Sequence, residues 1–502
     1  MAISPSQPKT AAIMIQGTGS DVGKSFLVAA LARAFVNRGI AVSPFKPQNM
    51  SNNAAVCKGG EIGRAQALQA KAARVTPTVD MNPVLLKPES EIGAQVIVRG
   101  RLAYHISAKD YHILKGDLLE EVLKSFNAVS KNCDLVLIEG AGSPSEVNLR
   151  KGDIANMGFA RAADIPVLLV GDIERGGVIA SLIGTFATLS KDDRLKIKGL
   201  IINKFRGDTS LFDNAHGILE DSTGVPLIGV IPWCKHASIL PKEDSSSLKK
   251  ESLILPDDKK SIIRISILRL PRIANFDDFD PLNAEPSISL NFVETGEPIP
   301  GNCDLVIIPG SKSTLSDLKS IKAEGWDIDI IAHTRRGGRV LGICGGYQML
   351  GRSIKDEAGI EGFPGVEKGL NLLDVNTTIE KEKTVVEVDA IHAGTKTNIS
   401  GYEIHMGQTS GPDSTRPWAI HKNGRTDGAI SINSQVAGTY IHGIFTSDSF
   451  RHAWITSFLQ EKNLNSKVIN WNQTIENALD EIASQLEESL DLNHILEIAR
   501  GR

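Results

Sequence analysis

The stretch AIMIQGTGSDVGKSFLVAALARAF, residues 12–35, leads from an apolar run through a glycine-rich loop into a pattern with helical spacing. In such a strand–loop–helix unit, the backbone N–H groups of the loop and the helix N-terminus hold phosphate oxygens. Lys24 is expected to reach the terminal phosphates, and Ser25 is expected to bind Mg²⁺. The expected nucleotide-binding residues of this loop are Gly17, Thr18, Asp21, Val22, Gly23, Lys24 and Ser25.

The spacing of this loop is a variant of the usual phosphate loop. Counted back from Gly23, the position of the usual first glycine is occupied by Thr18, and Gly17 lies one residue earlier. The loop therefore resembles the dethiobiotin synthetase-like branch of P-loop proteins, whose loop has the form GTxxxxGKT. The resemblance implies that Lys46 of FKPQN faces phosphate and that Glu139 of LVLIEGAGS binds Mg²⁺. Asn203 of INKFRGD would suit an adenine edge, because an amide both donates and accepts hydrogen bonds.

Short, fully apolar runs separated by helical patterns continue through the first half. Such runs are typical of a parallel sheet covered on both faces, so we expect an α/β fold. The further strand candidates are Leu135–Ile138, Val167–Val170, Leu200–Ile202 and Leu227–Ile231, and after a Ser-, Lys- and Asp-rich segment Ile262–Leu270, Leu305–Ile308 and Val340–Ile343. The expected division is a nucleotide-binding domain over 1–240, a linker over 241–260, a second α/β domain over 261–456 and a C-terminal helical extension over 457–502.

The second half carries RVLGICGGYQMLG, residues 339–351. An apolar strand that enters Gly-x-Cys-Gly-Gly and then a helix predicts a nucleophile elbow, with the Cys344 thiol at the helix N-terminus, which lowers a thiol pKa. His442 of GTYIHGIF is the expected base for Cys344. The N–H groups of Gly310, in VIIPGSKST, and of Gly345 are expected to form an oxyanion hole.

These features resemble the class I glutamine amidotransferase domains, which implies a flavodoxin-like fold and release of ammonia from glutamine. Members of that class often carry a Glu two residues after the His, where this chain has Ile444. The cobyrinate-type subgroup also lacks this Glu. The group that orients His442 stays open between Glu403 and a backbone carbonyl, and His405 either binds substrate or packs.

Both halves, in this order, resemble the cobyric acid synthase family over nearly the whole chain. The more specific stretches are KPQNMSNN, GEIGRAQALQA, DMNPVLLKP, EGAGSPSEVNLR, DIANMG and GDIERGGVIAS. The resemblance implies ATP- and glutamine-dependent amidation of the b, d, e and g carboxylates of adenosylcobyrinic acid a,c-diamide through acyl phosphates, with ATP, Mg²⁺, glutamine and the corrinoid as ligands. The alternative within the same chemistry is a cobyrinic acid a,c-diamide synthase or a related amidating ligase.

Three further sites keep two interpretations each. Asp153 of KGDIANMG would assist catalysis, as a base for ammonia or a ligand of a second Mg²⁺, or would cap a helix. Arg64 would pair with a corrinoid carboxylate or lie solvated on a helix. The segment Asp172–Arg175 follows a strand and would face nucleotide or substrate.

Composition excludes several classes of protein. A net charge of -4 does not suggest a nucleic-acid binder. Five scattered cysteines without CxxC spacing argue against a disulfide scaffold and a structural zinc site, and favour the cytoplasm. No apolar run approaches membrane-spanning length, so no membrane partner is expected. A non-catalytic ATPase switch would have no use for Cys344 and His442. A homo-oligomer stays open.

Overall fold

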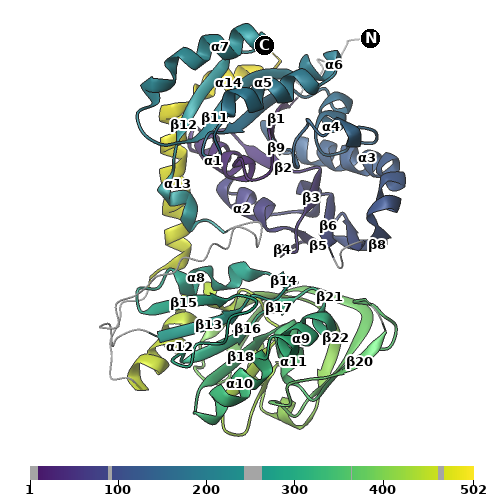
Figure 1. Ribbon diagram of the computed structural model, residues 1–502, viewed down its shortest axis with the longest axis vertical. Helices are drawn as coiled ribbons and strands as arrows, with labels where there is room; N and C mark the ends of the chain where they lie inside the picture. The colour runs from purple at the N-terminus through teal and green to yellow at the C-terminus, as the bar shows by residue number, and fades with distance from the viewer. Residues whose placement is uncertain (1–9, 89–92, 242–262, 363, 462–468, 502) are drawn as a thin grey trace, which may run out of the picture.

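The computed structural model describes residues 10–88, 93–241, 263–362, 364–461 and 469–501, and the expected linker therefore lies almost entirely outside the described residues. Two lobes lie one above the other along the longest axis (Figure 1). The upper lobe holds the nucleotide-binding half and the lower lobe holds the second α/β unit. The chain returns to the upper lobe at its C-terminus.

The upper lobe is built on a parallel six-stranded sheet in the order β12-β11-β10-β1-β9-β2. All residues of the central strand β1 are buried, because helices cover both faces of the sheet. The five expected strands of this half are confirmed. They are β1 (Ala11–Gly17), β9 (Leu135–Glu139), β10 (Val167–Asp172), β11 (Ile197–Phe205) and β12 (Leu227–Pro232), and the sixth strand, β2 (Val42–Phe45), was not predicted.

Helices form a layer on each face of this sheet. One face packs against α1 (Lys24–Asn37), α13 (Trp471–Ser489) and α14 (Leu492–Ala499). The other face packs against α3 (Ala108–Ser130), α4 (Met157–Ala162), α5 (Val178–Thr188) and α7 (Asp213–Thr223). The short α6 (Lys191–Arg194) leads into β11.

An excursion of the chain between β2 and α3 lies on the side of the upper lobe that faces the lower lobe (Figure 1). The sequence did not predict its strands. It comprises a four-stranded sheet in the order β3-β6-β7-β8, the hairpin β4-β5, and helix α2. The bounds are β3 (Gln48–Met50), β4 (Ala54–Cys57), β5 (Gly60–Gly63), α2 (Arg64–Ala72), β6 (Val84–Pro88), β7 (Gly93–Val98) and β8 (Arg101–Ser107).

The lower lobe has a six-stranded sheet in the order β15-β13-β16-β18-β26-β25, parallel except for the edge strand β25. The three strands predicted here are found. Beside this sheet stands a long antiparallel hairpin, β21 with β22. The main sheet holds β13 (Ile263–Leu268), β15 (Ile288–Val293), β16 (Leu305–Ile308), β18 (Arg339–Ile343), β25 (Ala429–Ile430) and β26 (Val436–Thr439). The hairpin joins β21 (Asn376–His392) to β22 (Asn398–Ser410), and the helices include α8 (Asp280–Asn283), α9 (Thr314–Ala323), α10 (Trp326–Arg335) and α11 (Gly345–Leu350).

The C-terminal helices divide between the two lobes. α12 (Asp448–Glu461) packs in the lower lobe, whereas α13 runs up the side of the upper lobe (Figure 1). Arg33 of α1, fully buried, pairs with Glu476 at 2.6 Å and with Asp480 at 3.3 Å on α13. Helices α13 and α14 of the predicted extension therefore belong to the hydrophobic core of the upper lobe.

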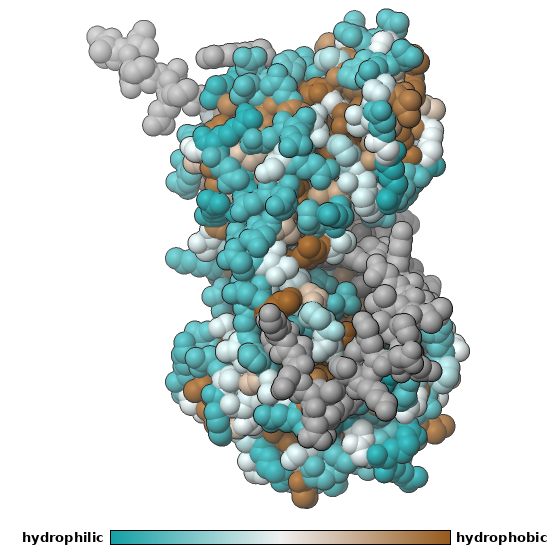
Figure 2. All heavy atoms as spheres, turned by 90° about the vertical axis from the view of Figure 1, so that its left-hand side faces the viewer, coloured by the Kyte–Doolittle hydropathy of each residue, from teal (hydrophilic) through white to brown (hydrophobic). Residues whose placement is uncertain are grey.

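On the side where α13 lies, hydrophilic residues prevail among those that the structure describes. Seen from that side, both lobes are mostly hydrophilic, and apolar residues form smaller groups (Figure 2). Among the helices that the structure describes, none has the length and apolar character to span a bilayer.

Candidate active site

The phosphate loop connects the C-terminal end of β1 to α1. Gly23 precedes the helix with a φ of 96°, a left-handed conformation that favours glycine. The Lys24 ammonium donates to the backbone oxygens of Gly19 and Gly142, both at 2.9 Å. Lys24 therefore lies folded back across the loop, over the space where phosphate oxygens would lie.

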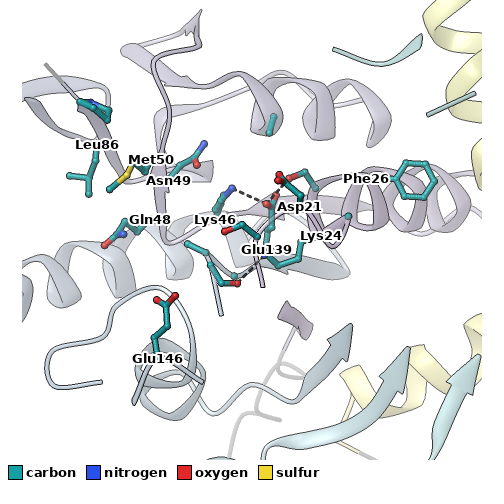
Figure 3. Close-up of a pocket in the computed structure, with 18 of the residues that line it drawn as sticks. Asp21, Lys24, Phe26, Lys46, Gln48, Asn49, Met50, Leu86, Glu139 and Glu146 are labelled. Carbon is teal, nitrogen blue, oxygen red and sulfur yellow. Dashed lines mark hydrogen bonds and ion pairs between the residues drawn. The ribbon is translucent and has the colours of Figure 1, made fainter. Parts of the chain in front are cut away.

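Glu139, at the end of β9, is the centre of a polar cluster beside this loop. Its Oε1 accepts hydrogen bonds from Ser25 Oγ at 2.7 Å and from Lys46 Nζ at 2.8 Å. Figure 3 shows Lys46, Lys24 and Glu139 close together, with Lys46 bonded to the Glu139 carboxylate. A hydroxyl and a carboxylate are the oxygen ligands that Mg²⁺ prefers, so this donor set fits the ion. The sequence-predicted residues Lys24, Ser25, Lys46 and Glu139 are thus brought together.

A cavity of about 1390 Å³ opens above this cluster. Asp172, Glu174 and Arg175, which the sequence placed near nucleotide or substrate, line it. Trp233 also lines it, and the Arg206 guanidinium lies 3.7 Å from the centre of its ring. Trp233 was not predicted from the sequence as a residue of this site. An aromatic ring directly after a strand end was the signal that could have identified Trp233.

Asn203 does not have the position expected of an adenine ligand. Its Nδ2 donates to the backbone oxygen of Val22 at 2.9 Å, and the residue is 3% exposed. A Cβ on Gly23 would come within 2.3 Å of the same amide nitrogen. Asn203 therefore braces the phosphate loop from β11 and does not line the large cavity, which argues against the adenine assignment. Asp21, in the loop itself, has a φ of 60° and lies at the mouth of the cavity.

Asp153 acts as a helix cap in this structure. Its Oδ1 accepts from the backbone N–H groups of Ala155 at 2.8 Å and Asn156 at 2.9 Å. Its Oδ2 accepts from Gly158 N at 2.8 Å. Three N–H donors at the start of α4 occupy the carboxylate, and Asp153 does not line the large cavity. The geometry supports the capping interpretation of the two that the sequence left open, and the catalytic role of Asp153 stays a prediction.

Cys344 occupies a strained turn between β18 and α11. Its φ of 52° and ψ of -109° are unusual for a residue with a side chain, and strain of this kind concentrates at functional sites. Gly346 permits the turn, because a Cβ there would lie 2.0 Å from the backbone oxygen of Ile308. The elbow predicted from the sequence is therefore present, and the thiol lines a second, narrow cavity of about 40 Å³.

His442 lies beside Cys344 and is oriented by Asp278. Nδ1 of His442 is 2.6 Å from Asp278 Oδ2, and Asp278 Oδ1 accepts from Gly443 N at 2.7 Å. Burial alone would lower the pKa of His442, but the Asp278 carboxylate and the Cys344 sulfur raise it to about 10. The arrangement is a Cys–His–Asp triad whose acid comes from the segment after β14 (Ile273–Ala274).

Glu403, the carboxylate that the sequence offered for orienting His442, has other partners. It is fully buried and pairs with Arg425 at 2.6 Å and with His421 at 3.3 Å. His405 stacks on Tyr440 with 3.8 Å between ring centres and also lines the narrow cavity, so it both packs and faces the site. The orienting group is therefore Asp278, and neither of the two expected groups.

The glycines expected at the oxyanion hole lie around the triad. Gly310, in β17 (Gly310–Ser311), packs so close to His442 that a Cβ would lie 2.8 Å from the imidazole carbon. Gly345 lines the narrow cavity together with Cys344. The structure thus brings Cys344, His442, Gly310 and Gly345 into one site, as the sequence predicted.

The upper lobe contributes to the narrow cavity. Asn52 and Lys87, both from the excursion, line it together with lower-lobe residues. Lys87 and Lys383 of β21 both bind the buried Glu61 carboxylate. Burial lowers the pKa of Lys87 to about 7, although Glu61 opposes the shift. The glutaminase site is therefore completed by residues of the nucleotide-binding half.

The comparisons with known proteins match both halves. Residues 13–248 match the model of the CobQ/CobB/MinD/ParA nucleotide binding domain, and residues 264–450 match the CobB/CobQ-like glutamine amidotransferase domain. The chain is 54% identical to the cobyric acid synthase of Methylorubrum populi over 98% of this chain and 99% of the relative. It is also 54% identical to that of Bradyrhizobium diazoefficiens, over 97% and 99%, and 56% identical to that of Rhizobium leguminosarum, over 96% and 98%. The chain therefore belongs to the cobyric acid synthase family, the glutamine-dependent amidating enzymes of cobalamin biosynthesis.

Proposed function

We propose that this chain converts adenosylcobyrinic acid a,c-diamide to cobyric acid by amidating the b, d, e and g carboxylates, with ATP, Mg²⁺ and glutamine. The observation that carries the proposal is the pairing of two sites in one chain. A phosphate loop with a metal-ligand pair lines the large cavity, and a Cys–His–Asp triad lines the narrow one. An ATP-driven ligase fed by glutamine needs both.

The large cavity supports activation of a carboxylate by ATP. A carboxylate is a poor electrophile, so its oxygen first attacks the γ-phosphorus of ATP and displaces ADP. Ammonia then attacks the carbonyl carbon of the resulting acyl phosphate, loses a proton and displaces inorganic phosphate, which leaves the amide. Lys24 and Lys46 would offset the charge on the phosphoryl oxygens during this transfer. Ser25 and Glu139 would hold Mg²⁺, which would supply positive charge against the phosphate oxygens. Lys46 and Ser25 both donate to Oε1 of Glu139, so the Lys46 ammonium lies beside the proposed Mg²⁺ ligands.

The triad supports release of ammonia from glutamine. His442 accepts the thiol proton, and the Cys344 sulfur attacks the side-chain amide carbon. The oxyanion would be held by the N–H groups of Gly310 and Gly345. His442 then returns the proton to the departing nitrogen, and water hydrolyses the thioester. Asp278 fixes the imidazole with Nε2 toward the sulfur, because Nδ1 faces its carboxylate.

Charged side chains in the narrow cavity suit the amino-acid end of glutamine. Glu361 and Lys312 both line it, so carboxylate and ammonium groups are present together. Burial raises the pKa of Glu361 to about 7, and the Thr314 N–H donates to it at 2.7 Å. A zwitterion would match this pair, with its ammonium at Glu361 and its carboxylate toward Lys312.

The two cavities share a wall, which supports internal transfer of ammonia. Strands β3 and β6 are paired, with Met50 opposite Leu86. Met50 and Leu86 line the large cavity, whereas Asn52 and Lys87, in the same two segments, line the narrow one. Ammonia released at the triad would therefore cross one layer of the excursion to reach the acyl phosphate.

The test is mass spectrometry of adenosylcobyrinic acid a,c-diamide after incubation with the protein, ATP, Mg²⁺ and glutamine. We expect a product with one new amide at each of the b, d, e and g positions. A parallel reaction with ammonium in place of glutamine isolates the synthetase step. An unchanged corrinoid in both reactions, with ATP left intact, would refute the proposal.

A further inference from the structure

Helix α2 touches the metal-ligand cluster with one part of its surface. Gln69 Nε2 lies 2.5 Å from Glu139 Oε2, and Gln66 Nε2 lies 3.4 Å from the same oxygen. Both glutamines are fully buried. The carboxylate that is proposed to bind Mg²⁺ is therefore held on one oxygen by α2 and on the other by Ser25 and Lys46.

The first residue of the same helix reaches into the lower lobe. Nε of Arg64 lies 2.5 Å from Oδ2 of Asp277, and its side chain is 21% exposed. Arg64 is thus neither solvated nor left for a corrinoid carboxylate, which corrects both interpretations offered by the sequence. The guanidinium also lies 5.9 Å from the centre of the Tyr402 ring.

Both contacts of Arg64, Asp277 and Tyr402, lie next to groups that hold His442 in place. The Tyr402 ring stacks on His442 with 5.4 Å between ring centres and an interplanar angle of 17°. The backbones of these two residues exchange hydrogen bonds of 3.1 and 2.8 Å. Asp277 directly precedes Asp278, which binds Nδ1 of His442. Arg64 therefore contacts the imidazole support from two directions.

The charge of Arg64 compensates a buried carboxylate next to the groups that hold His442. Asp277 is 3% exposed, and within the part of the chain that the structure describes its ion-pair partner is Arg64. A buried carboxylate that loses its cation leaves an uncompensated charge and forces its surroundings to rearrange. Here the surroundings are Asp278 and Tyr402, the groups that fix His442. A second clamp holds the lobes nearby, since Asn53 Oδ1 accepts from Asn275 N at 2.7 Å and Asn275 Oδ1 accepts from Ala54 N at 3.1 Å.

We propose that Arg64 is a positioning residue of the glutaminase site, supplied by the nucleotide-binding half, and that α2 transmits the occupancy of the ATP site to the triad. This inference rests on the proposed function, which places Mg²⁺ at Glu139. A cation at that carboxylate competes with the amide groups of Gln66 and Gln69 for the same oxygen, so α2 must adjust when the site fills. Arg64 adjusts with it and shifts Asp277 and Tyr402. Glutamine is thereby hydrolysed fastest when nucleotide is bound.

The first experiment compares the native chain with Arg64→Gln, Arg64→Lys and the isosteric Asp277→Asn. Glutamine hydrolysis and ammonium-driven amidation are measured separately. We expect Arg64→Gln and Asp277→Asn to lower kcat for glutamine hydrolysis at least about tenfold, with KM for glutamine within about threefold of the native value. Ammonium-driven amidation should stay within about twofold, and Arg64→Lys should recover part of the rate. The matched control is Arg352→Gln, which breaks an exposed pair with Asp374 on the lower lobe.

A second readout does not depend on turnover. The rate of Cys344 alkylation by iodoacetamide is followed by mass spectrometry, with and without a non-hydrolysable ATP analogue and Mg²⁺. The analogue should change this rate in the native chain and in Arg352→Gln, and should leave it unchanged in Arg64→Gln. An Arg64→Gln variant that hydrolyses glutamine at the native rate, or whose alkylation still responds to the analogue, overturns the inference. An equal fall in ammonium-driven amidation also overturns it, because that result indicates a general loss of structure. Failure of the proposed function would show instead as absent amidation by the native chain.

Discussion

The substitution Asp278→Asn tests the triad most directly. Asp278 accepts two short hydrogen bonds, from His442 Nδ1 at 2.6 Å and Gly443 N at 2.7 Å, and is 2% exposed. A hydrogen bond to a charged group contributes about 1.5–3 kcal/mol, and about 1.4 kcal/mol corresponds to a tenfold change in rate. Losing the charge at this bond should therefore lower kcat for glutamine hydrolysis by about 10- to 100-fold.

The direction of the accompanying pH change follows from His442. Asp278 helps to raise the pKa of His442 to about 10, so its removal lowers that pKa. The imidazolium that must protonate the departing ammonia then persists only to a lower pH. The alkaline limb of kcat/KM for glutamine should move to lower pH in Asp278→Asn, whereas a purely structural defect would lower the whole profile without moving it.

The assay separates the two half-reactions. Glutaminase is followed by glutamate release, and synthetase is followed by amidation with ammonium as the nitrogen source. Ammonium-driven amidation should be unchanged, since Asp278 lies in the lower lobe and does not line the large cavity. The reasoning is refuted if Asp278→Asn hydrolyses glutamine at the native rate with an unmoved pH profile.

Three further outcomes are expected. Cys344→Ala should abolish glutamine-dependent amidation and retain the ammonium-driven reaction, and product analysis with each nitrogen source checks this. Since the pKa of Glu361 is raised to about 7 by burial, its carboxyl is neutral below that pH. KM for glutamine should fall about tenfold between about pH 6 and pH 8, and Glu361→Gln should remove this dependence. Leu479→Ala, which truncates a fully buried side chain of α13, should lower the unfolding free energy of the upper lobe by about 2–5 kcal/mol, measured against exposed Glu481→Ala by denaturant titration.

The parts of the site that the sequence predicted all have local signals. The phosphate loop and the elbow at Cys344 each join a buried strand to a helix through glycines, and both turns are dictated within a few residues. His442 was identified because a cysteine nucleophile requires a general base, and this histidine follows a short strand pattern. Lys46 and Glu139 were predicted from the resemblance to a known family of phosphate loops. In the structure, Lys46 Nζ lies 2.8 Å from Glu139 Oε1.

The parts that were missed depend on contacts between distant segments. Asp278 lies 164 residues before its partner His442, in a stretch whose neighbouring Asp277 and Asp280 carry the same charge, so no spacing distinguishes it. The backbone partner of Asn203 was not foreseen, and the two interpretations of Asp153 stayed open, because side-chain chemistry alone does not reveal a backbone partner. Asn203 holds a loop carbonyl, and Asp153 holds three N–H groups. In both cases, a polar group is buried against the main chain rather than offered to a ligand.

The placement of both sites follows from one topological rule. In parallel α/β sheets, ligands bind beyond the carboxyl ends of the strands. β1 and β9 end at Gly17 and Glu139, and β18 ends immediately before Cys344. The excursion after β2 lies beyond the carboxyl edge of the upper sheet. Its strand β6 lines both cavities, and β3 lines the large cavity while Asn52, just after β3, lines the narrow one. Asn52 and Lys87 of the nucleotide-binding half line the narrow cavity, so the lower lobe alone would lack part of the glutaminase site. The structure therefore accounts for the fusion of two activities in one chain: the excursion that lines the synthetase cavity is also a wall of the site that supplies its ammonia.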